Sequence, residues 1–200
     1  MNVVRKIKNG ISIILDEIGL LFKLVIVRWP TGYIGNKLRC KYYSRRLKFL
    51  GENPGLHFGV KLDNPDLITI GKNCLFGEEV TITAGNCNGI FIGRDVAISN
   101  RSYIRSAIHR FDRIDISILE QGYTTAKIQY NGSVYSIVIE DEVWIGSNAI
   151  ILSGANIGKG CMISAGAMVS NTIPPYSIVV GNPGRVIGNR LKKIENNEKV

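Results

Sequence analysis

The chain has 200 residues, of which 45% are hydrophobic and 20% are charged. This length suits one domain with an appendage, and the apolar content excludes a disordered chain. Residues 1–50 carry the whole excess of basic over acidic side chains, because residues 51–200 hold fourteen of each sign. A nucleic-acid-binding body is therefore excluded, since the body lacks a basic surface for phosphates.

Residues 1–50 are predicted to form a basic helical segment. Apolar side chains recur at helical spacing before Trp29-Pro30, and a second helical pattern runs from Asn36 to Leu50. The segment either attaches to an anionic membrane surface or caps the domain that follows. The apolar positions are Ile11, Ile14, Leu15, Ile18, Leu21, Phe22 and Val25, and the basic positions of the second pattern are Lys37, Lys41, Arg45 and Lys48.

The run 11–27 is neither a signal peptide nor a membrane span by sequence, because charged residues interrupt it and no small-residue cleavage site follows. Four cysteines are present, and none has the CxxC spacing of a zinc or redox site. Free thiols in a cytoplasmic protein are the simplest interpretation. The cysteines are Cys40, Cys74, Cys87 and Cys161.

An aliphatic residue recurs every six positions from Ile139 to Val169, and a small or aliphatic residue follows each one four positions later. The same period appears upstream, with slips in register. A period of six fits neither a helix nor a long strand, but it fits short strands joined by sharp corners. Three such faces close a coil, which predicts a parallel β-helix. The upstream inward positions are Phe58, Ile70, Phe76, Ile82, Ile92, Ile98 and Ile104, with Leu62, Ile68, Cys74, Val80, Val96 and Ile108 at the second position.

The hexads stop after His109 and resume near Ile137, so the residues between them must project as a loop. His109 is a candidate general base, because histidine titrates near neutral pH, and the alternative is a surface histidine at a turn. The other histidine, His57, is interpreted as structural or surface. Asp112, Asp115 and Glu120 could orient His109 or could be solvated loop charges. Two histidines do not support a three-histidine zinc site, and no metal is expected.

The repeat and its C-terminal end resemble the hexapeptide-repeat acyltransferases, in the branch of polysaccharide, galactoside and maltose O-acetyltransferases. The resemblance covers about residues 50–190 and implies a left-handed parallel β-helix. It divides the chain into the segment 1–50, an acyltransferase domain 51–190 with an inserted loop 109–137, and a tail 191–200. Its most specific stretches are Val143-Trp144-Ile145-Gly146-Ser147, Ile173-Pro174-Pro175-Tyr176-Ser177 and Val180-Gly181-Asn182-Pro183-Gly184-Arg185-Val186-Ile187.

The resemblance implies that acetyl-CoA is the acyl donor and that His109 activates an acceptor hydroxyl for direct attack. It also implies that the coenzyme lies between neighbouring subunits of a homotrimer. Two departures weaken the coenzyme site, because Asn171 replaces the usual lysine and Gly188 replaces a second arginine. Each small residue of the site also fits plain corner packing, and Trp144 fits a subunit contact. The residues assigned to coenzyme binding are Trp144, Ser147, Ala165, Ser170 and Arg185.

These inferences predict a cytoplasmic, CoA-dependent O-acetyltransferase that acts on a sugar hydroxyl in the synthesis of surface polysaccharide, such as O-antigen, capsule or exopolysaccharide. The acceptor is a sugar or a lipid-linked glycan, and residues 1–50 would hold the enzyme at the inner membrane face. One alternative is an N-acyltransferase that acts on an amino-sugar nucleotide. The other is a non-catalytic solenoid scaffold, which predicts no CoA binding.

Overall fold

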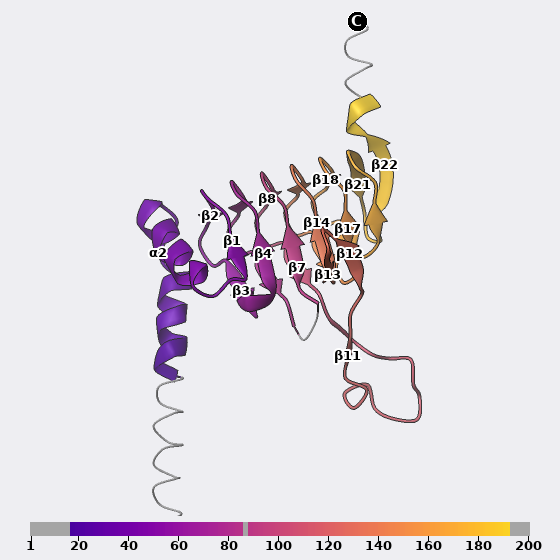
Figure 1. Ribbon diagram of the computed structural model, residues 1–200, viewed down its shortest axis with the longest axis horizontal. Helices are drawn as coiled ribbons and strands as arrows, with labels where there is room; N and C mark the ends of the chain where they lie inside the picture. The colour runs from indigo at the N-terminus through magenta and orange to yellow at the C-terminus, as the bar shows by residue number, and fades with distance from the viewer. Residues whose placement is uncertain (1–16, 86–87, 193–200) are drawn as a thin grey trace, which may run out of the picture.

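The computed structural model describes residues 17–85 and 88–192. Three parallel sheets wind into a solenoid, with helices at its N-terminal end and an antiparallel hairpin at its C-terminal end (Figure 1). Successive strands visit sheet 1, sheet 2 and sheet 3 in turn, so each circuit of the chain forms one coil. The parallel β-helix predicted from the hexads is confirmed.

The strands are short and are distributed evenly over the three sheets. Sheet 1 contains β1 (Phe49–Leu50), β4 (Ile68–Ile70), β7 (Ile90–Ile92), β14 (Ile137–Ile139), β17 (Asn156–Ile157) and β20 (Thr172–Ile173). Sheet 2 contains β2 (Gly55–Leu56), β5 (Leu75–Phe76), β8 (Ala97–Ile98), β15 (Trp144–Ile145), β18 (Met162–Ile163) and β21 (Ser177–Val180), with β22 (Arg185–Asn189) antiparallel to β21. Sheet 3 contains β3 (Lys61–Asp63), β6 (Thr81–Thr83), β9 (Tyr103–Arg105), β16 (Ile150–Leu152) and β19 (Met168–Val169).

The aliphatic hexad positions form the core. Ile92, Ile139 and Ile157 lie in register on neighbouring strands of sheet 1, and all three are fully buried. Two upstream assignments were wrong. Phe58 is only half-buried at a corner, and Leu56 points inward in its place; Ile108 is exposed because the chain leaves the solenoid there.

The corners between sheets 1 and 2 and between sheets 2 and 3 contain a left-handed backbone residue in each of the first five coils. Asn, Asp, Glu, Arg and Gly all occupy these positions, so the corner does not require glycine. The glycine at position 146, in the Ile145-Gly146 pair, is required for a steric reason. A Cβ on Gly146 would lie 2.4 Å from the backbone nitrogen of Ala165 in the next coil. The left-handed residues are Asn53, Asn73, Asp95, Glu142 and Gly160 at the first corner, and Gly59, Glu79, Arg101, Asn148 and Gly166 at the second.

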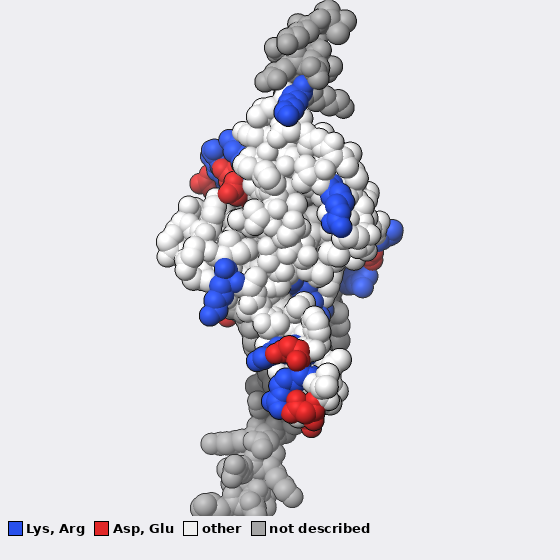
Figure 2. Space-filling view, turned by 90° about the vertical axis from the view of Figure 1, so that its right-hand side faces the viewer, with Lys and Arg blue, Asp and Glu red and all other residues white. Residues whose placement is uncertain are grey.

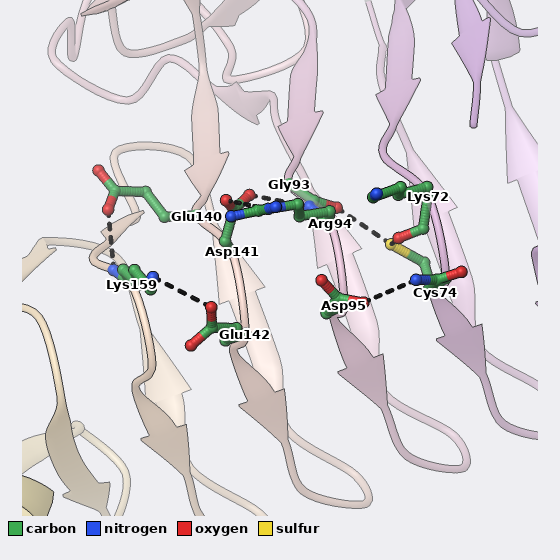
Figure 3. A network of polar contacts seen from close by, with 10 residues as sticks. Lys72, Cys74, Gly93, Arg94, Asp95, Glu140, Asp141, Glu142 and Lys159 are labelled. Carbon is green, nitrogen blue, oxygen red and sulfur yellow. Dashed lines mark hydrogen bonds and ion pairs between the residues drawn. The ribbon is translucent and has the colours of Figure 1, made fainter. Parts of the chain in front are cut away.

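Polar side chains connect the coils along the corner between sheets 1 and 2 (Figure 3). Asp141 accepts hydrogen bonds from the backbone and the guanidinium of Arg94, at 2.9 and 2.8 Å. Burial raises the pKa of Asp141, but the contacts with Arg94 outweigh it and hold the pKa below its usual range. Burial also raises the pKa of the Cys74 thiol to about 11, and its Sγ donates to the Gly93 carbonyl at 3.0 Å.

Insertions are confined to the corner between sheets 3 and 1, which we call the insertion corner. The 3-10 helix η1 (Pro65–Leu67) lies there between β3 and β4, and the connection between β6 and β7 is also longer than those at the other corners. The largest insertion follows β9 and projects away from the solenoid, as the interrupted hexads predicted (Figure 1). Between β1 and β20, the longer connections therefore all lie at this one corner of the solenoid.

Helix α2 (Tyr33–Ser44) packs against the first coil. The guanidinium of Arg39 is buried and donates to the carbonyls of Leu56 and Trp29, at 2.7 and 2.6 Å. The predicted helix 36–50 extends too far, because the chain turns after Ser44 and enters sheet 1 at β1. Backbone pairing between β1 and β4 replaces helical hydrogen bonds at the end of that segment.

Residues 17–27 form a helix at the N-terminal end of the solenoid (Figure 1). Most of its apolar side chains are exposed to solvent. Ile26 and Val27 are buried, whereas Leu21 and Phe22 are 62% and 61% exposed. The predicted apolar positions Ile11, Ile14 and Leu15 lie outside the described residues. No helix in the described ranges is long and apolar enough to cross a membrane.

Tyr43→Phe tests whether α2 stabilises the solenoid. The Tyr43 hydroxyl donates to the Val60 carbonyl at 3.3 Å and accepts from the Leu62 amide at 3.2 Å, and both residues are buried. Loss of the hydroxyl leaves two buried backbone groups without this partner, so we expect stability to fall by about 1–3 kcal/mol in denaturant unfolding. Tyr33→Phe, at an exposed position of the same helix, should have no effect. Equal stability of the two variants would contradict a capping role.

Candidate functional site

His109 lies where the chain leaves the solenoid. Strand β10 (Ile108–His109) pairs antiparallel with β11 (Tyr123–Thr124), which places Tyr123 opposite His109. The two rings stack with centroids 4.3 Å apart. The Nδ1 atom of His109 is buried and has no hydrogen-bond partner among the described residues. A buried polar atom without a partner destabilises a fold by about 1–3 kcal/mol, and such atoms call for a functional explanation.

The loop carboxylates are engaged within the loop. Arg110 pairs with Asp112 at 2.7 Å, Arg113 pairs with Asp115, and the Glu120 carboxylate accepts from the Ser117 amide at 3.1 Å. The hydrogen-bonded arginines lower the pKa values of Asp112 and Asp115. Figure 2 shows basic and acidic side chains next to one another on the projecting loop. Of the two roles that the sequence allowed for Asp112 and Asp115, the structure therefore favours solvated loop charges over partners of His109.

A cluster of hydroxyl groups fixes the return of the loop to the solenoid. Thr125 donates to the Ser106 carbonyl at 2.7 Å and contacts the hydroxyl of Ser136. The Ala126 amide donates to the Ser153 hydroxyl at 2.8 Å. Because Thr125 follows β11 directly, this cluster also fixes the strand that carries Tyr123 beside His109.

The chain after the cluster forms a second hairpin, of β12 (Ile128–Tyr130) and β13 (Ser133–Tyr135). Tyr130 and Tyr135 pack against Phe91 on the outer face of sheet 1. Their ring centroids lie 4.9 and 5.5 Å, respectively, from that of Phe91. The inserted segment is thus attached at both of its ends, and only its tip is free of the solenoid.

A cavity of about 200 Å³ lies near the base of the loop, and His109 is not among its lining residues. Tyr123 connects the two, because it lines the cavity and packs against the imidazole. The other lining residues are Thr83, Gly85, Arg105 and Ala107.

The residues assigned to coenzyme binding lie on several surfaces of one chain. Ser147 and Ala165 occupy the corner between sheets 2 and 3 in adjacent coils, where the Gly166 amide donates to the Ser147 carbonyl at 2.9 Å. Ser170 is exposed at the insertion corner, on the same edge as His109. A single chain therefore brings Ser147 close to Ala165, but it places this pair and Ser170 on opposite edges of sheet 3.

Trp144 and Arg185 lie away from His109. Trp144 points outward from sheet 2 and donates to the Ser99 hydroxyl at 3.1 Å, beside a groove of about 410 Å³ that Met162 and Ile178 also line. Arg185 is exposed on β22, the antiparallel strand at the end of sheet 2.

No cluster of three His, Cys, Asp or Glu residues that could hold a metal ion occurs in the described ranges. Cys40, Cys74 and Cys161 are free thiols, and Cys87 lies outside the described residues.

Sequence reasoning missed Tyr123, Arg105 and Thr125. Tyr123 and Thr125 lie inside the insertion, where the hexad period is absent, so no local pattern marks them. Arg105 did leave a signal, because it occupies an outward position of the hexad register four residues before His109.

Two family models match the solenoid. Residues 136–171 match the bacterial transferase hexapeptide (six repeats), and residues 67–105 match the hexapeptide repeat of succinyl-transferase. A maltose O-acetyltransferase from Clostridium difficile is similar in structure, with a TM-score of 0.65 and 26% identity over 84% of this chain and 82% of that one. A hexapeptide-repeat acetyltransferase from Vibrio cholerae, complexed with acetyl-CoA, has a TM-score of 0.65 and 24% identity over the same shares.

Sequence relatives agree with the structural ones. A probable acetyltransferase from Mycobacterium tuberculosis is 30% identical over 163 residues, which are 74% of this chain and 51% of the relative. A putative acetyltransferase from Schizosaccharomyces pombe is 33% identical over 143 residues, covering 70% of this chain and 54% of the relative. The chain spans about half the length of these curated relatives.

The solenoid is thus built of the hexapeptide repeats that both family models describe. Its fold is similar to that of hexapeptide-repeat acetyltransferases, and acetyltransferases are also among its sequence relatives.

Proposed function

We propose that this chain is an acetyl-CoA-dependent O-acetyltransferase with His109 as its general base. The observation that carries the proposal is the buried, unpartnered Nδ1 of His109, at the base of a loop and beside a cavity. Most buried side-chain nitrogens in folded proteins are hydrogen-bonded, so this one favours a functional role over a structural one. Similarity to a maltose O-acetyltransferase supports a sugar hydroxyl as the acceptor, in the synthesis of surface polysaccharide.

In the proposed reaction the acceptor hydroxyl attacks the thioester carbonyl of acetyl-CoA. His109 takes the hydroxyl proton as the new C–O bond forms, and the proton passes to the sulfur of CoA when the C–S bond breaks. Tyr123 keeps the imidazole plane fixed by stacking on it, so a small rotation does not misplace the base. The described loop carboxylates are engaged within the loop, so none of them orients the imidazole.

A trimer would explain the distribution of the coenzyme residues. Ser147 and Ala165 lie on one edge of sheet 3 and His109 and Ser170 on the other, so one chain offers separate halves of a binding groove. Closed threefold symmetry would bring the first edge of one subunit towards the second edge of the next. Arg185 would then contribute charge at the end of the groove. Exposed apolar side chains at the loop tip would be covered in such an assembly; they are Phe111, Ile114, Ile118 and Leu119.

Residues 17–50 support peripheral contact with an anionic membrane, such as the inner face of the cytoplasmic membrane. A groove of about 280 Å³ is lined by apolar and aromatic residues of both helices and by basic residues; they are Phe22, Ile26, Leu38 and Tyr42, and Lys41, Arg45 and Arg46. An apolar surface beside basic side chains is typical of helices that lie in the lipid headgroup region. A lipid-linked glycan would then be presented close to the enzyme.

His109→Ala should lower kcat by about 10²–10⁴-fold, the contribution of a positioned general base. Acetyl-CoA affinity should change less than a few fold, because the proposed coenzyme site lies on other residues. His57→Ala is the control, since His57 lines a separate cavity with Asn36 and Arg39. CoA release across sugars, oligosaccharides and amines measures the activity. Unchanged turnover in His109→Ala, with CoA still bound, would refute the mechanism.

The trimer is tested by light scattering, which should return about 66 kDa for three chains of 22.1 kDa. Ile114→Asp combined with Leu119→Asp should weaken association, because both side chains are exposed in the single chain and would be buried in the assembly. A stable wild-type monomer at micromolar concentration would eliminate the site between subunits.

Membrane contact should be sensitive to salt, because charge attraction to anionic lipid is screened. Reversal of the exposed Lys37, Lys41, Arg45 and Lys48 to Glu should abolish flotation with anionic vesicles and leave the oligomer intact. Lys72→Glu, on an exposed corner of the solenoid, should float like the wild type. Collapse of the oligomer in the reversed variant would instead assign these residues to the cap alone.

A further inference from the structure

Arg105 occupies the outward position at the end of β9, in register with Thr83 on β6. The same column contains one carboxylate, Asp63 on β3, which is opposite Thr83. Asp63 is already paired with Lys23 at 3.2 Å and with Lys61 at 3.0 Å. The column therefore offers no free counter-charge to Arg105.

Arg105 differs in this respect from the arginines nearest to it in the chain. Arg101 pairs with Glu79 at 3.1 Å, and Arg110 pairs with Asp112 at 2.7 Å. Arg105 forms no ion pair with any described residue. Its Nε donates to the Ala107 carbonyl at 2.9 Å, and its Nη1 donates to the Tyr103 hydroxyl at 3.3 Å. Neutral acceptors thus orient the guanidinium while its charge stays uncompensated.

The oriented guanidinium lines the cavity that Tyr123 shares with His109, and none of the described acidic residues lines that cavity. Its volume of about 200 Å³ is below the range of roughly 300–1,000 Å³ that suits drug-sized ligands. The cavity is large enough for one sugar ring or another small group. Tyr123 forms part of its wall and packs against His109, so this side chain links a ligand held there to the proposed base.

We infer that Arg105 binds a carboxylate or phosphate on the acceptor, and that the enzyme selects anionic acceptors. This inference rests on the proposed function. A guanidinium that is already oriented binds carboxylate and phosphate oxygens with two parallel hydrogen bonds, which a neutral acceptor cannot form. Arg105 is thus a specificity-determining residue, and His109 removes the proton from whichever hydroxyl the anchored acceptor presents.

The test measures acetyl transfer from acetyl-CoA to three matched acceptors, namely methyl glucoside, methyl glucuronide and glucose 1-phosphate. The neutral sugar is the reference, and the other two distinguish carboxylate from phosphate. We expect the wild type to prefer one of the anionic acceptors. Arg105→Gln should raise the KM for that acceptor about 10- to 100-fold, the effect of losing a charged hydrogen bond. The KM for acetyl-CoA should change less than twofold, and turnover of methyl glucoside should fall much less than turnover of the anionic acceptor.

Arg101→Gln is the matched control, because Arg101 lies in the same coil but pairs with Glu79 and does not line the cavity. Arg105→Lys keeps the charge and should recover part of the preference. An equal loss with neutral and anionic acceptors would overturn the inference and make Arg105 structural. A rise only in the KM for acetyl-CoA would also overturn it, by assigning Arg105 to the coenzyme.

Calorimetric binding of the same three sugars, without acetyl-CoA, separates this inference from the proposed function. Tighter binding of an anionic sugar that Arg105→Gln abolishes would support the inference even if the wild type transferred no acetyl group. Equal binding of all three sugars would overturn it even if acetyl transfer were observed.

Discussion

Hydrogen bonds between successive coils are the constraint on which the other features of this chain depend. The solenoid strands contain only two to four residues, so each coil finds its backbone partners in the coils on either side. Inward side chains must then stay in register over many coils, as Ile92, Ile139 and Ile157 do. Extra residues are accommodated only where the chain leaves the solenoid and returns to the same register.

This constraint explains which parts of the fold could be predicted. Hexads between Ile139 and Val169 follow the repeat without interruption, and the structure places them as expected. Phe58 was misplaced because a single aromatic residue near the first coil satisfied the period by chance. The helix predicted to reach Leu50 ended earlier because pairing with β4 outweighed a local helical pattern.

The candidate site could be predicted only in part, for a related reason. His109 stood out because it interrupts a regular pattern. Its surroundings depend on contacts between residues far apart in the chain, such as Thr125 with Ser106 and Ser136, which no local spacing reveals. Arg105 is notable because it pairs with no described carboxylate. Only the three-dimensional arrangement reveals this, because sequence spacing does not show which charges are paired.

The insertion corner has a consequence for how such a chain can diversify. A segment added at this corner begins after a strand of sheet 3 and ends before a strand of sheet 1. It therefore leaves the core and the other two corners unchanged. A longer, shorter or differently charged loop could replace this one without altering the inter-coil pairing. A replacement segment would need only to pair with the polar groups of Ser106 and Ser153, which Thr125 and Ala126 occupy in this chain, to return to the same register.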